Sequence, residues 1–338
     1  MTKPLGDRAR GPSRNWGNQV KVLLVAVAAV FAVAAGANDG SSILAGGRQV
    51  SAFRPTTAWI VLVAAVAVGP ILIGTHVAVT LSRGLVPFSG PGSKRAFIVA
   101  VLSAMLVVLG LTRVGVSTSL TLSLLGAIAG AGLGAGMHVD LSRFVTVVGF
   151  GFAAPVASAS LAYAFARVVL PMLRAQDLGR RLRTTHAVTF GAQCLAYATN
   201  GGQKVLALLI VATGSTARGR VVLPRLDIAL AAVPFGLGVL LGVRRVSAKL
   251  GRGVLAVRLR HTVVAEAVST VLSLSAGLVG VPLTMSQSVA GALVGAGASE
   301  GIHRVRWAVA GRFVGAWVLT VPTSMGIAAA ASAIARRA

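Results

Sequence analysis

Cysteine, acidic side chains and charge of any kind are scarce in this chain of 338 residues. The single cysteine, Cys194, excludes an intrachain disulfide and a cysteine metal cluster. The five histidines show no metal-ligand spacing, and no Walker motif is found, so neither a resident metal nor an ATPase is indicated. With 12% charged and 55% hydrophobic residues, the composition excludes a soluble domain. We therefore expect no enzyme activity and no cofactor.

Long apolar runs take up most of the chain. From Val20 to Ile334 they recur at the length that a helix needs to cross a bilayer, and the 41 glycines suit close packing of membrane helices. The prediction is an all-α polytopic protein of the cell (plasma) membrane, with about 10–12 transmembrane helices, some of them broken or paired as hairpins. The runs lie near 20–47, 57–81, 96–112, 114–137, 142–170, 187–213, 227–243, 262–279, 281–298 and 305–334.

Lysine and arginine outnumber the acids by 32 to 7, yet this excess does not indicate nucleic acid as a partner. The cations lie mostly in short loops and tails, as is usual beside membrane helices, and the expected partner is the lipid bilayer. The loop at 244–260 carries six of them, which makes it cytoplasmic by the positive-inside rule. The basic tail at the N-terminus argues for the opposite orientation.

The chain contains two copies of one pattern. Residues 115–126 align without a gap with 280–291, and farther upstream Asn38 meets Asn200. Five spans in each copy would give the copies opposite topologies, the inverted repeats of many secondary transporters. The predicted organisation is a basic N-terminal tail, a first transmembrane repeat, a basic central loop and a second transmembrane repeat, at 1–19, 20–170, 171–186 and 187–335.

The segment GANDG, from Gly36 to Gly40, places an amide and a carboxylate inside an apolar run. An acid at membrane depth is costly and indicates function. The glycines permit a break in the helix, and a break frees backbone groups for an ion or a substrate. Asp39 would then supply a hard oxygen ligand or a proton acceptor. The alternative is an ordinary Asn-Gly turn with Asp39 in solvent.

Hydroxyl side chains open a Gly-rich helical segment in each repeat. Such side chains and the free N–H groups of a helix N-terminus suit a tetrahedral oxyanion. If a pseudo-two-fold axis relates the two sets, they converge on one midplane site. The alternative is that they cap or pack helices. The sets are Ser119, Thr121 and Ser123 against Thr284, Ser286 and Ser288.

Two more charged residues fall inside apolar runs. Lys204, whose repeat partner is Ser42, needs a counter-ion or an anionic substrate. Glu266 is a candidate partner of Lys204 or a member of a proton path. The alternative is that either side chain snorkels to an interface.

At these residues the chain resembles the PiT family of inorganic phosphate transporters, over roughly residues 20–334. GAND at 36–39 matches the first family motif, NGGQK at 200–204 resembles the second-repeat form NDGQK, and 316–322 is also similar. The resemblance implies a secondary active symporter that imports phosphate with Na⁺ or H⁺ as the coupling ion. It places Asn38, Asp39 and Asn200 in the cation and substrate region.

The complete set of candidates has two parts. The candidates for substrate binding are Asn38, Asn200, Ser119, Thr121, Thr284, Ser286, Gln203 and Lys204. The candidates for cation coupling are Asp39, Asn38, Asn200 and Glu266.

The chain departs from the family pattern in ways that bear on the substrate. Gly201 stands where the second motif has aspartate, both motif histidines are absent, and Leu120 and Met285 replace the middle hydroxyls. Phosphate can donate a hydrogen bond and sulfate cannot, so a lost acceptor weakens the preference for phosphate. We predict phosphate as substrate and sulfate as the alternative. The alternative of another class is a transport-inactive sensor or scaffold, and a homodimer is compatible with either.

Overall fold

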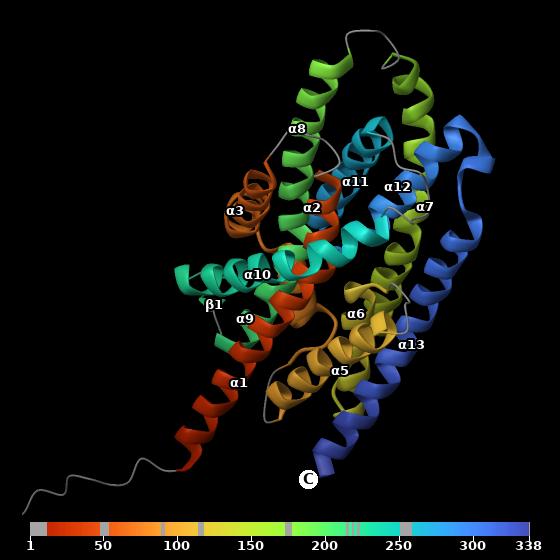
Figure 1. The fold of residues 1–338 in the computed structure, drawn as a ribbon. Helices are drawn as coiled ribbons and strands as arrows, with labels where there is room; N and C mark the ends of the chain where they lie inside the picture. Colours follow the sequence, from red (N-terminus) through yellow and green to blue (C-terminus); the bar gives the residue numbers. More distant parts are fainter. Residues whose placement is uncertain are drawn as a thin grey trace, which may run out of the picture.

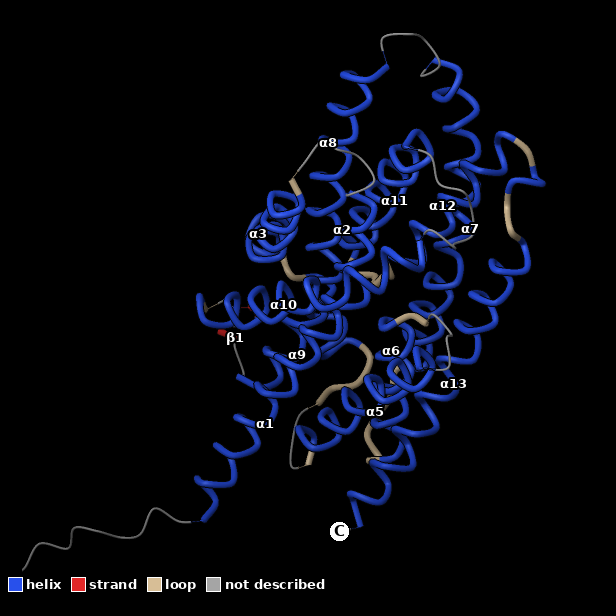
Figure 2. The backbone as a smooth tube through the Cα atoms, in the orientation of Figure 1, coloured by secondary structure: helices blue, strands red, loops and turns tan. Residues whose placement is uncertain are grey.

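The structure, a computed structural model, describes residues 12–47, 54–88, 92–113, 118–172, 178–213, 216–217, 220–221, 224–250 and 259–337 (Figures 1 and 2). Helices account for nearly all of them, in agreement with the predicted all-α class. A hairpin of two short strands, β1 (Thr216–Ala217) and β2 (Arg220–Val221), is the exception in the described residues.

The helices fall into two series of matching order. The first series is α1 (Pro12–Ala35), η1 (Gly36–Gly40), α2 (Ser41–Gly47), α3 (Pro55–Ile73), α4 (His76–Val79), η2 (Thr80–Gly84), α5 (Ser93–Arg113), α6 (Leu120–Gly134) and α7 (Leu141–Met172). The second is α8 (Leu178–Tyr197), η3 (Ala198–Gly202), α9 (Gln203–Thr213), α10 (Arg225–Leu250), α11 (Leu259–Val279), α12 (Met285–Glu300), η4 (Ile302–Arg304) and α13 (Trp307–Arg337).

The ten predicted spans resolve into eight long ones and two half-length helices. Eight of the described helical segments are long and apolar enough to cross a membrane. α6 and α12 have 15 and 16 residues, too few for a crossing that takes about 20. The predicted span at 57–81 is also interrupted, because α3 ends at Ile73 and Gly74 takes a φ of +99° that other residues rarely adopt.

The predicted loop at 244–260 begins as helix, because α10 continues to Leu250. Residues 251–258 lie outside the described ranges, and the orientation that rests on this loop stays a prediction. Helix also reaches into the predicted tail and central loop, since α1 begins at Pro12 and α8 at Leu178.

The two repeats run in opposite directions. In Figure 1, α1 rises from the lower left towards α2, whereas α8 descends from the top towards α9. The last helices show the same reversal, since α7 ascends and α13 descends to the C-terminus. The predicted inverted repeats are confirmed.

Each repeat is packed against the other through its half-length helix. α6 of the first repeat lies along α13, and α12 of the second lies along α7. Glycine makes this approach possible: a Cβ at Gly130 would lie 2.1 Å from the Met325 carbonyl oxygen, and one at Gly295 would lie 1.9 Å from that of Ala159. η1 and η3 are crossed in the same way, η1 against α10 and η3 against α3. The half-length helix and the π segment of each repeat therefore pack against helices of the other repeat.

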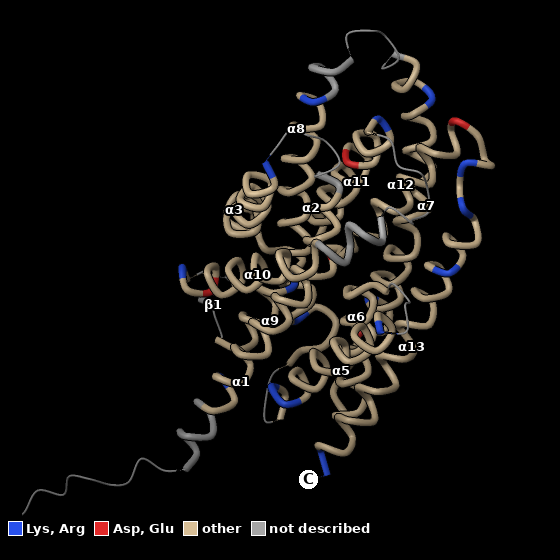
Figure 3. The backbone as a smooth tube through the Cα atoms, in the orientation of Figure 1, with Lys and Arg blue, Asp and Glu red and all other residues tan. Residues whose placement is uncertain are grey.

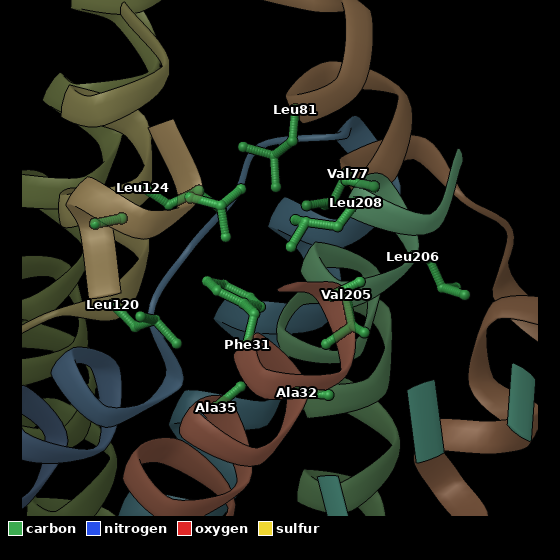
Figure 4. Packing of buried hydrophobic residues seen from close by; sticks show 14 of the residues in the cluster. Phe31, Ala32, Ala35, Val77, Leu81, Leu120, Leu124, Val205, Leu206 and Leu208 are labelled. Atoms are coloured by element: carbon green, nitrogen blue, oxygen red, sulfur yellow. The ribbon is translucent and has the colours of Figure 1, made fainter. Parts of the chain in front are cut away.

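The apolar core lies where α1, α6 and α9 meet. Figure 4 shows the ring of Phe31 in the middle of this region, with Leu120 and Leu124 on one side and Val205 and Leu208 on the other. All five side chains are at most 1% exposed. The core thus joins helices of both repeats.

The outer faces are apolar. Leu72, Leu241 and Val168 are 67%, 70% and 66% exposed, and many other large apolar side chains on the long helices are also uncovered. Such surfaces suit lipid and not water. Lys and Arg lie mostly at helix ends and turns, leaving the middle of the long helices almost free of charge (Figure 3). The chain is a multi-pass protein of the plasma membrane.

Candidate functional site

Asn38, Asp39 and Asn200 lie in two π-helical segments, η1 and η3, at equivalent places in the two repeats. A single π turn inside an α-helix widens the backbone and frequently marks a functional site. Each segment continues directly from one helix into the next, so the predicted break is a widened turn. Asp39 is 1% exposed, and the alternative of a solvated Asn-Gly turn is wrong.

The half-length helices begin next to each other. Ser119 is the N-cap of α6 and Thr284 the N-cap of α12, and their side-chain oxygens are 2.7 Å apart. Ser119 Oγ also accepts a hydrogen bond of 3.2 Å from the Leu122 N–H. Two helix N-termini, each with unsatisfied N–H groups and a partial positive charge, therefore meet at one place.

Two crossed pairs flank this junction. Lys204 Nζ, from α9, donates to Thr121 Oγ1 in the first turn of α6 at 2.5 Å. Ser286 Oγ, from the first turn of α12, donates to Asp39 Oδ1 in η1 at 3.4 Å. Thr121 and Ser286 are repeat equivalents, but their charged partners are not, since Lys204 is equivalent to Ser42 and Asp39 to Gly201. The site therefore carries a cation on one side and a carboxylate on the other. The structure thereby brings seven of the predicted residues together: Asn38, Asp39, Ser119, Thr121, Lys204, Thr284 and Ser286.

The Asp39 carboxylate is only half satisfied. Its Oδ1 accepts from Ser286 and from Asn38 Nδ2, the latter at 3.2 Å. Its Oδ2 is buried and has no hydrogen-bond partner in the described part of the chain. A buried carboxylate oxygen without a partner is costly. This oxygen can hold a cation or accept a proton from a ligand.

Asn200 and Gln203 hold backbone segments in place. Asn200 Nδ2 donates to the Val281 carbonyl at 3.1 Å and its Oδ1 accepts from the Leu283 N–H at 2.8 Å, which fixes the loop leading into α12. Gln203 Nε2 donates to the Gly74 carbonyl at 2.7 Å and its Oε1 accepts from the Ala78 N–H at 3.1 Å. Both amides thus stabilise the interrupted backbone next to the site. Their predicted role as substrate ligands stays a prediction.

Glu266 has partners on α8. Its Oε1 lies 3.2 Å from His186 Nε2, and its Oε2 accepts from Thr189 Oγ1 at 2.5 Å. The suggested pairing of Glu266 with Lys204 is wrong, since Lys204 donates to Thr121. His186 is completely buried and was not singled out from the sequence. His186 and Thr189 are three residues apart and so share one face of α8, and this spacing could have indicated a common partner.

One more buried polar group was missed. The amide of Gln287, in the first turn of α12, is 1% exposed, and neither its oxygen nor its nitrogen has a hydrogen-bond partner among the described residues. The sequence offered a sign, because Gln287 falls at the position of a family histidine. The amide adds a donor and an acceptor close to the α12 N-terminus.

A cavity of about 430 Å³ lies between α4, η2, α7 and the loop that precedes α12. It reaches Val281, whose carbonyl is held by Asn200. The exposed guanidinium of Arg143 lies in its wall and donates to the Gly84 carbonyl at 3.0 Å. Arg143 places a positive charge in a lining that is otherwise mainly apolar. Its lining consists of His76, Val79, Thr80, Gly84, Arg143, Thr146, Val147, Val279, Gly280 and Val281.

Known proteins resemble the chain over nearly its whole length. The sequence profile of the phosphate transporter family matches residues 35–186 and again 171–328. A probable low-affinity inorganic phosphate transporter of Bacillus subtilis (strain 168) is 24% identical over 318 residues, covering 92% of this chain and 95% of the relative. One of Rhizobium meliloti (strain 1021) is 25% identical over 316 residues, covering 90% and 93%.

The fold is also found among solved structures. A protein described as the sodium-dependent phosphate transporter superposes with a TM-score of 0.78 at 18% identity, covering 94% of this chain and 99% of that one. The double match of the family profile falls on the two repeats that the sequence and the fold reveal.

Proposed function

The chain belongs to the phosphate transporter family, and we propose that it is a secondary active symporter that imports inorganic phosphate together with a monovalent cation. The observation that carries this proposal is the pair of helix N-termini joined by Ser119 and Thr284, with Lys204 on one side and Asp39 on the other. The arrangement provides neighbouring places for an anion and a cation.

The anion is bound by the helix N-termini. The N–H groups and dipoles of α6 and α12 favour negative charge, and the hydroxyl of Thr121, which accepts from Lys204, adds a donor. The Lys204 ammonium supplies a full positive charge beside them, since it donates to Thr121 in the first turn of α6. A tetrahedral oxyanion with four oxygens makes use of all these donors at once.

The cation is bound at Asp39. The free Oδ2 is a hard oxygen of the kind that Na⁺ prefers, and the Asn38 amide holds the carboxylate in place by donating from Nδ2 to Oδ1. The structural neighbour is described as sodium-dependent, which favours Na⁺ as the coupling ion. H⁺ is the alternative, for which the buried pair of Glu266 and His186 is the candidate path.

Phosphate is favoured over sulfate by the same carboxylate. Monohydrogen phosphate donates a hydrogen bond that sulfate cannot, and Asp39 Oδ2 is a buried acceptor without a protein partner. A site with an unmatched acceptor binds the donating ligand better, because the other ligand leaves the acceptor unsatisfied. The relatives named as inorganic phosphate transporters agree with this choice.

Alternating access follows from the crossed pairs. Lys204 and Thr121 belong to different repeats, and so do Asp39 and Ser286. A rocking of one repeat against the other therefore opens both pairs together. Anion and cation stabilise the closed arrangement when both are bound, which couples their movements.

Uptake into proteoliposomes tests this function. Labelled phosphate or sulfate is offered with an inward Na⁺ gradient, an inward H⁺ gradient or neither. We expect phosphate uptake driven by Na⁺, with excess unlabelled phosphate competing more strongly than sulfate. Absence of uptake under every combination would instead support a transport-inactive sensor or scaffold.

A further inference from the structure

The ring of Tyr197 fills the space beside Gly201. A Cβ at Gly201 would lie 2.1 Å from Tyr197 Cε2 and 2.3 Å from Cζ, far inside van der Waals contact. Gly201 is the position where the first repeat has Asp39. A carboxylate cannot stand at this position while Tyr197 keeps its place.

The Tyr197 ring is itself held in position. It stacks on Phe235 of α10 with ring centroids 5.4 Å apart and planes at 28°. Phe235 in turn fills the space beside Gly40, where a Cβ would lie 2.5 Å from Phe235 Cζ. The stack thus runs from η3 through α10 to η1, and moving Tyr197 aside requires repacking between both π segments.

The Tyr197 hydroxyl lies in the same environment as Asp39. Tyr197 is 1% exposed, and its hydroxyl oxygen has no hydrogen-bond partner in the described structure. Phe235, on which the Tyr197 ring stacks, fills the space beside Gly40, the residue that follows Asp39. Two buried oxygens without partners, Tyr197 Oη and Asp39 Oδ2, therefore belong to one region. Buried polar atoms are rarely left unpaired, and a shared ligand accounts for both.

We propose that Tyr197 replaces the second carboxylate of the cation site: its ring excludes a side chain at Gly201, and its hydroxyl oxygen is a neutral ligand beside Asp39 that limits the site to one monovalent cation. This proposal rests on the proposed cation site. One carboxylate neutralises one Na⁺, whereas a second Na⁺ would remain an uncompensated charge in a buried place. A phenol oxygen supplies a lone pair without adding charge.

The dependence of the thermal midpoint on Na⁺ concentration tests the proposal without relying on transport. A ligand that binds the folded protein raises its stability in proportion to the logarithm of its concentration, with a slope set by the number of ions bound. The purified full-length protein is heated in NaCl of increasing concentration, with choline chloride keeping the ionic strength constant. We expect the wild type to show the slope of one ion. Y197F, which keeps the ring, should need about tenfold more Na⁺ for the same shift.

The double variant Y197A/G201D provides the sharper comparison. With the ring removed, an aspartate fits at 201, and the slope should rise to about twice the wild-type slope. G201D alone should unfold at a lower temperature than either the wild type or the double variant, because the ring and the carboxylate collide. The matched control for the collision is G201A, which adds only a Cβ at this position. It should destabilise the protein when Tyr197 is present, and the destabilisation should largely disappear when G201A is combined with Y197A.

Each outcome bears on a separate claim. Unchanged Na⁺ dependence in Y197F together with a slope of one ion in the double variant would overturn the proposal. So would a G201D variant as stable as the wild type. If the wild type is stabilised by Na⁺ as expected but takes up no anion in proteoliposomes, the proposed transport function fails and the role of Tyr197 stands.

Discussion

Ser119 Oγ and Thr284 Oγ1 lie 2.7 Å apart although 165 residues separate them in the chain. The same offset relates the two repeats, so each residue is bonded to its own equivalent. The contact therefore marks the pseudo-two-fold axis, and it holds the N-termini of α6 and α12 together where an oxyanion is proposed to bind.

This bond should show measurable coupling. S119A and T284A should each lower the free energy of unfolding by about 1 kcal/mol and weaken phosphate uptake, because each removes a donor and leaves the other hydroxyl unpaired. In the double variant the loss in the free energy of unfolding should be smaller than the sum of the two single losses, by about 1 kcal/mol. S123A is a suitable control, since Ser123 donates to the Ala104 carbonyl on α5 at 3.0 Å and not to the opposite repeat. Strictly additive effects would show that the contact carries no interaction energy.

Replacing the carboxylate should abolish coupling and not folding. D39N keeps the shape of the side chain and removes its charge, so Na⁺-driven uptake should fall roughly 100-fold, or about 3 kcal/mol in cation binding. The circular dichroism spectrum and the elution volume on gel filtration should match those of the wild type. Normal Na⁺-driven uptake by a folded D39N protein would rule out Asp39 as the cation ligand.

The ammonium of Lys204 should set the affinity for the anion. In K204M the apolar length of the side chain is kept and the charge is lost, so half-saturation with phosphate should require at least about tenfold more substrate. S42A is the control at the equivalent position of the first repeat, because Ser42 Oγ donates to the Asn38 carbonyl of its own helix at 2.8 Å. An unchanged half-saturation concentration in K204M would mean that the ammonium serves only to pair with Thr121.

Asn200 should behave as a support of the α12 N-terminus. N200A leaves the Val281 carbonyl and the Leu283 N–H without their partners, and we expect a loss of about 2 kcal/mol in the free energy of unfolding. Uptake should fall because the helix end is no longer held next to Ser119. High phosphate should restore the rate only in part. Full restoration by phosphate would instead identify Asn200 as a direct ligand.

The stability of the protein should depend on pH through Glu300, at the end of α12 and outside the long spans. Burial raises the pKa of this carboxyl, but His261, Arg260 and Arg304 together lower it below its ordinary value of 4.5. Arg260 Nη2 lies 2.5 Å and Arg304 Nη1 3.2 Å from its oxygens. A lowered folded-state pKa stabilises the protein above the unfolded-state value, and this contribution is lost as the pH falls through the folded-state value.

The variant E300Q measures this contribution. At pH 7 it should unfold at a lower temperature than the wild type, by no more than about 1 kcal/mol in free energy because Arg304 is exposed to solvent. The difference should shrink as the pH is lowered below 4.5. A constant difference between pH 7 and pH 3.5 would show that the effect of E300Q is not electrostatic.

Much of the fold can be predicted from local composition. Apolar length and loop charge predict membrane helices, and two matching series of glycines and hydroxyls predict the repeats, because both signals depend only on neighbours in the chain. Apolar length and loop charge could not distinguish the half-length helices from full spans. Apolar residues such as Val281 and Leu283 precede α12 without being part of it, and the N-terminal ends of α6 and α12 lie where Ser119 and Thr284 meet.

The candidate site was predicted as a set of residue types but not as a set of partners. The equivalence of Asn38 and Asn200 is visible in the sequence, yet one amide lies beside a carboxylate and the other holds the backbone of the loop that leads into α12. Glu266 and Lys204 look alike as buried charges, and their actual partners are on different helices. Side-chain pairing is a long-range property that spacing cannot encode.

By itself the sequence determined the membrane location, the internal duplication and the loss of one aspartate, because composition and repeated motifs are properties of the chain. Only the tertiary structure decided how the loss is accommodated. The inverted repeats cross so that Thr121 meets Lys204, Ser286 meets Asp39, and the Tyr197 ring fills the space at Gly201. The first two contacts join residues more than 80 positions apart in the chain, and the Tyr197 ring is held by its stack on Phe235 of α10. Packing between separate segments fixes all three, and local sequence does not specify it.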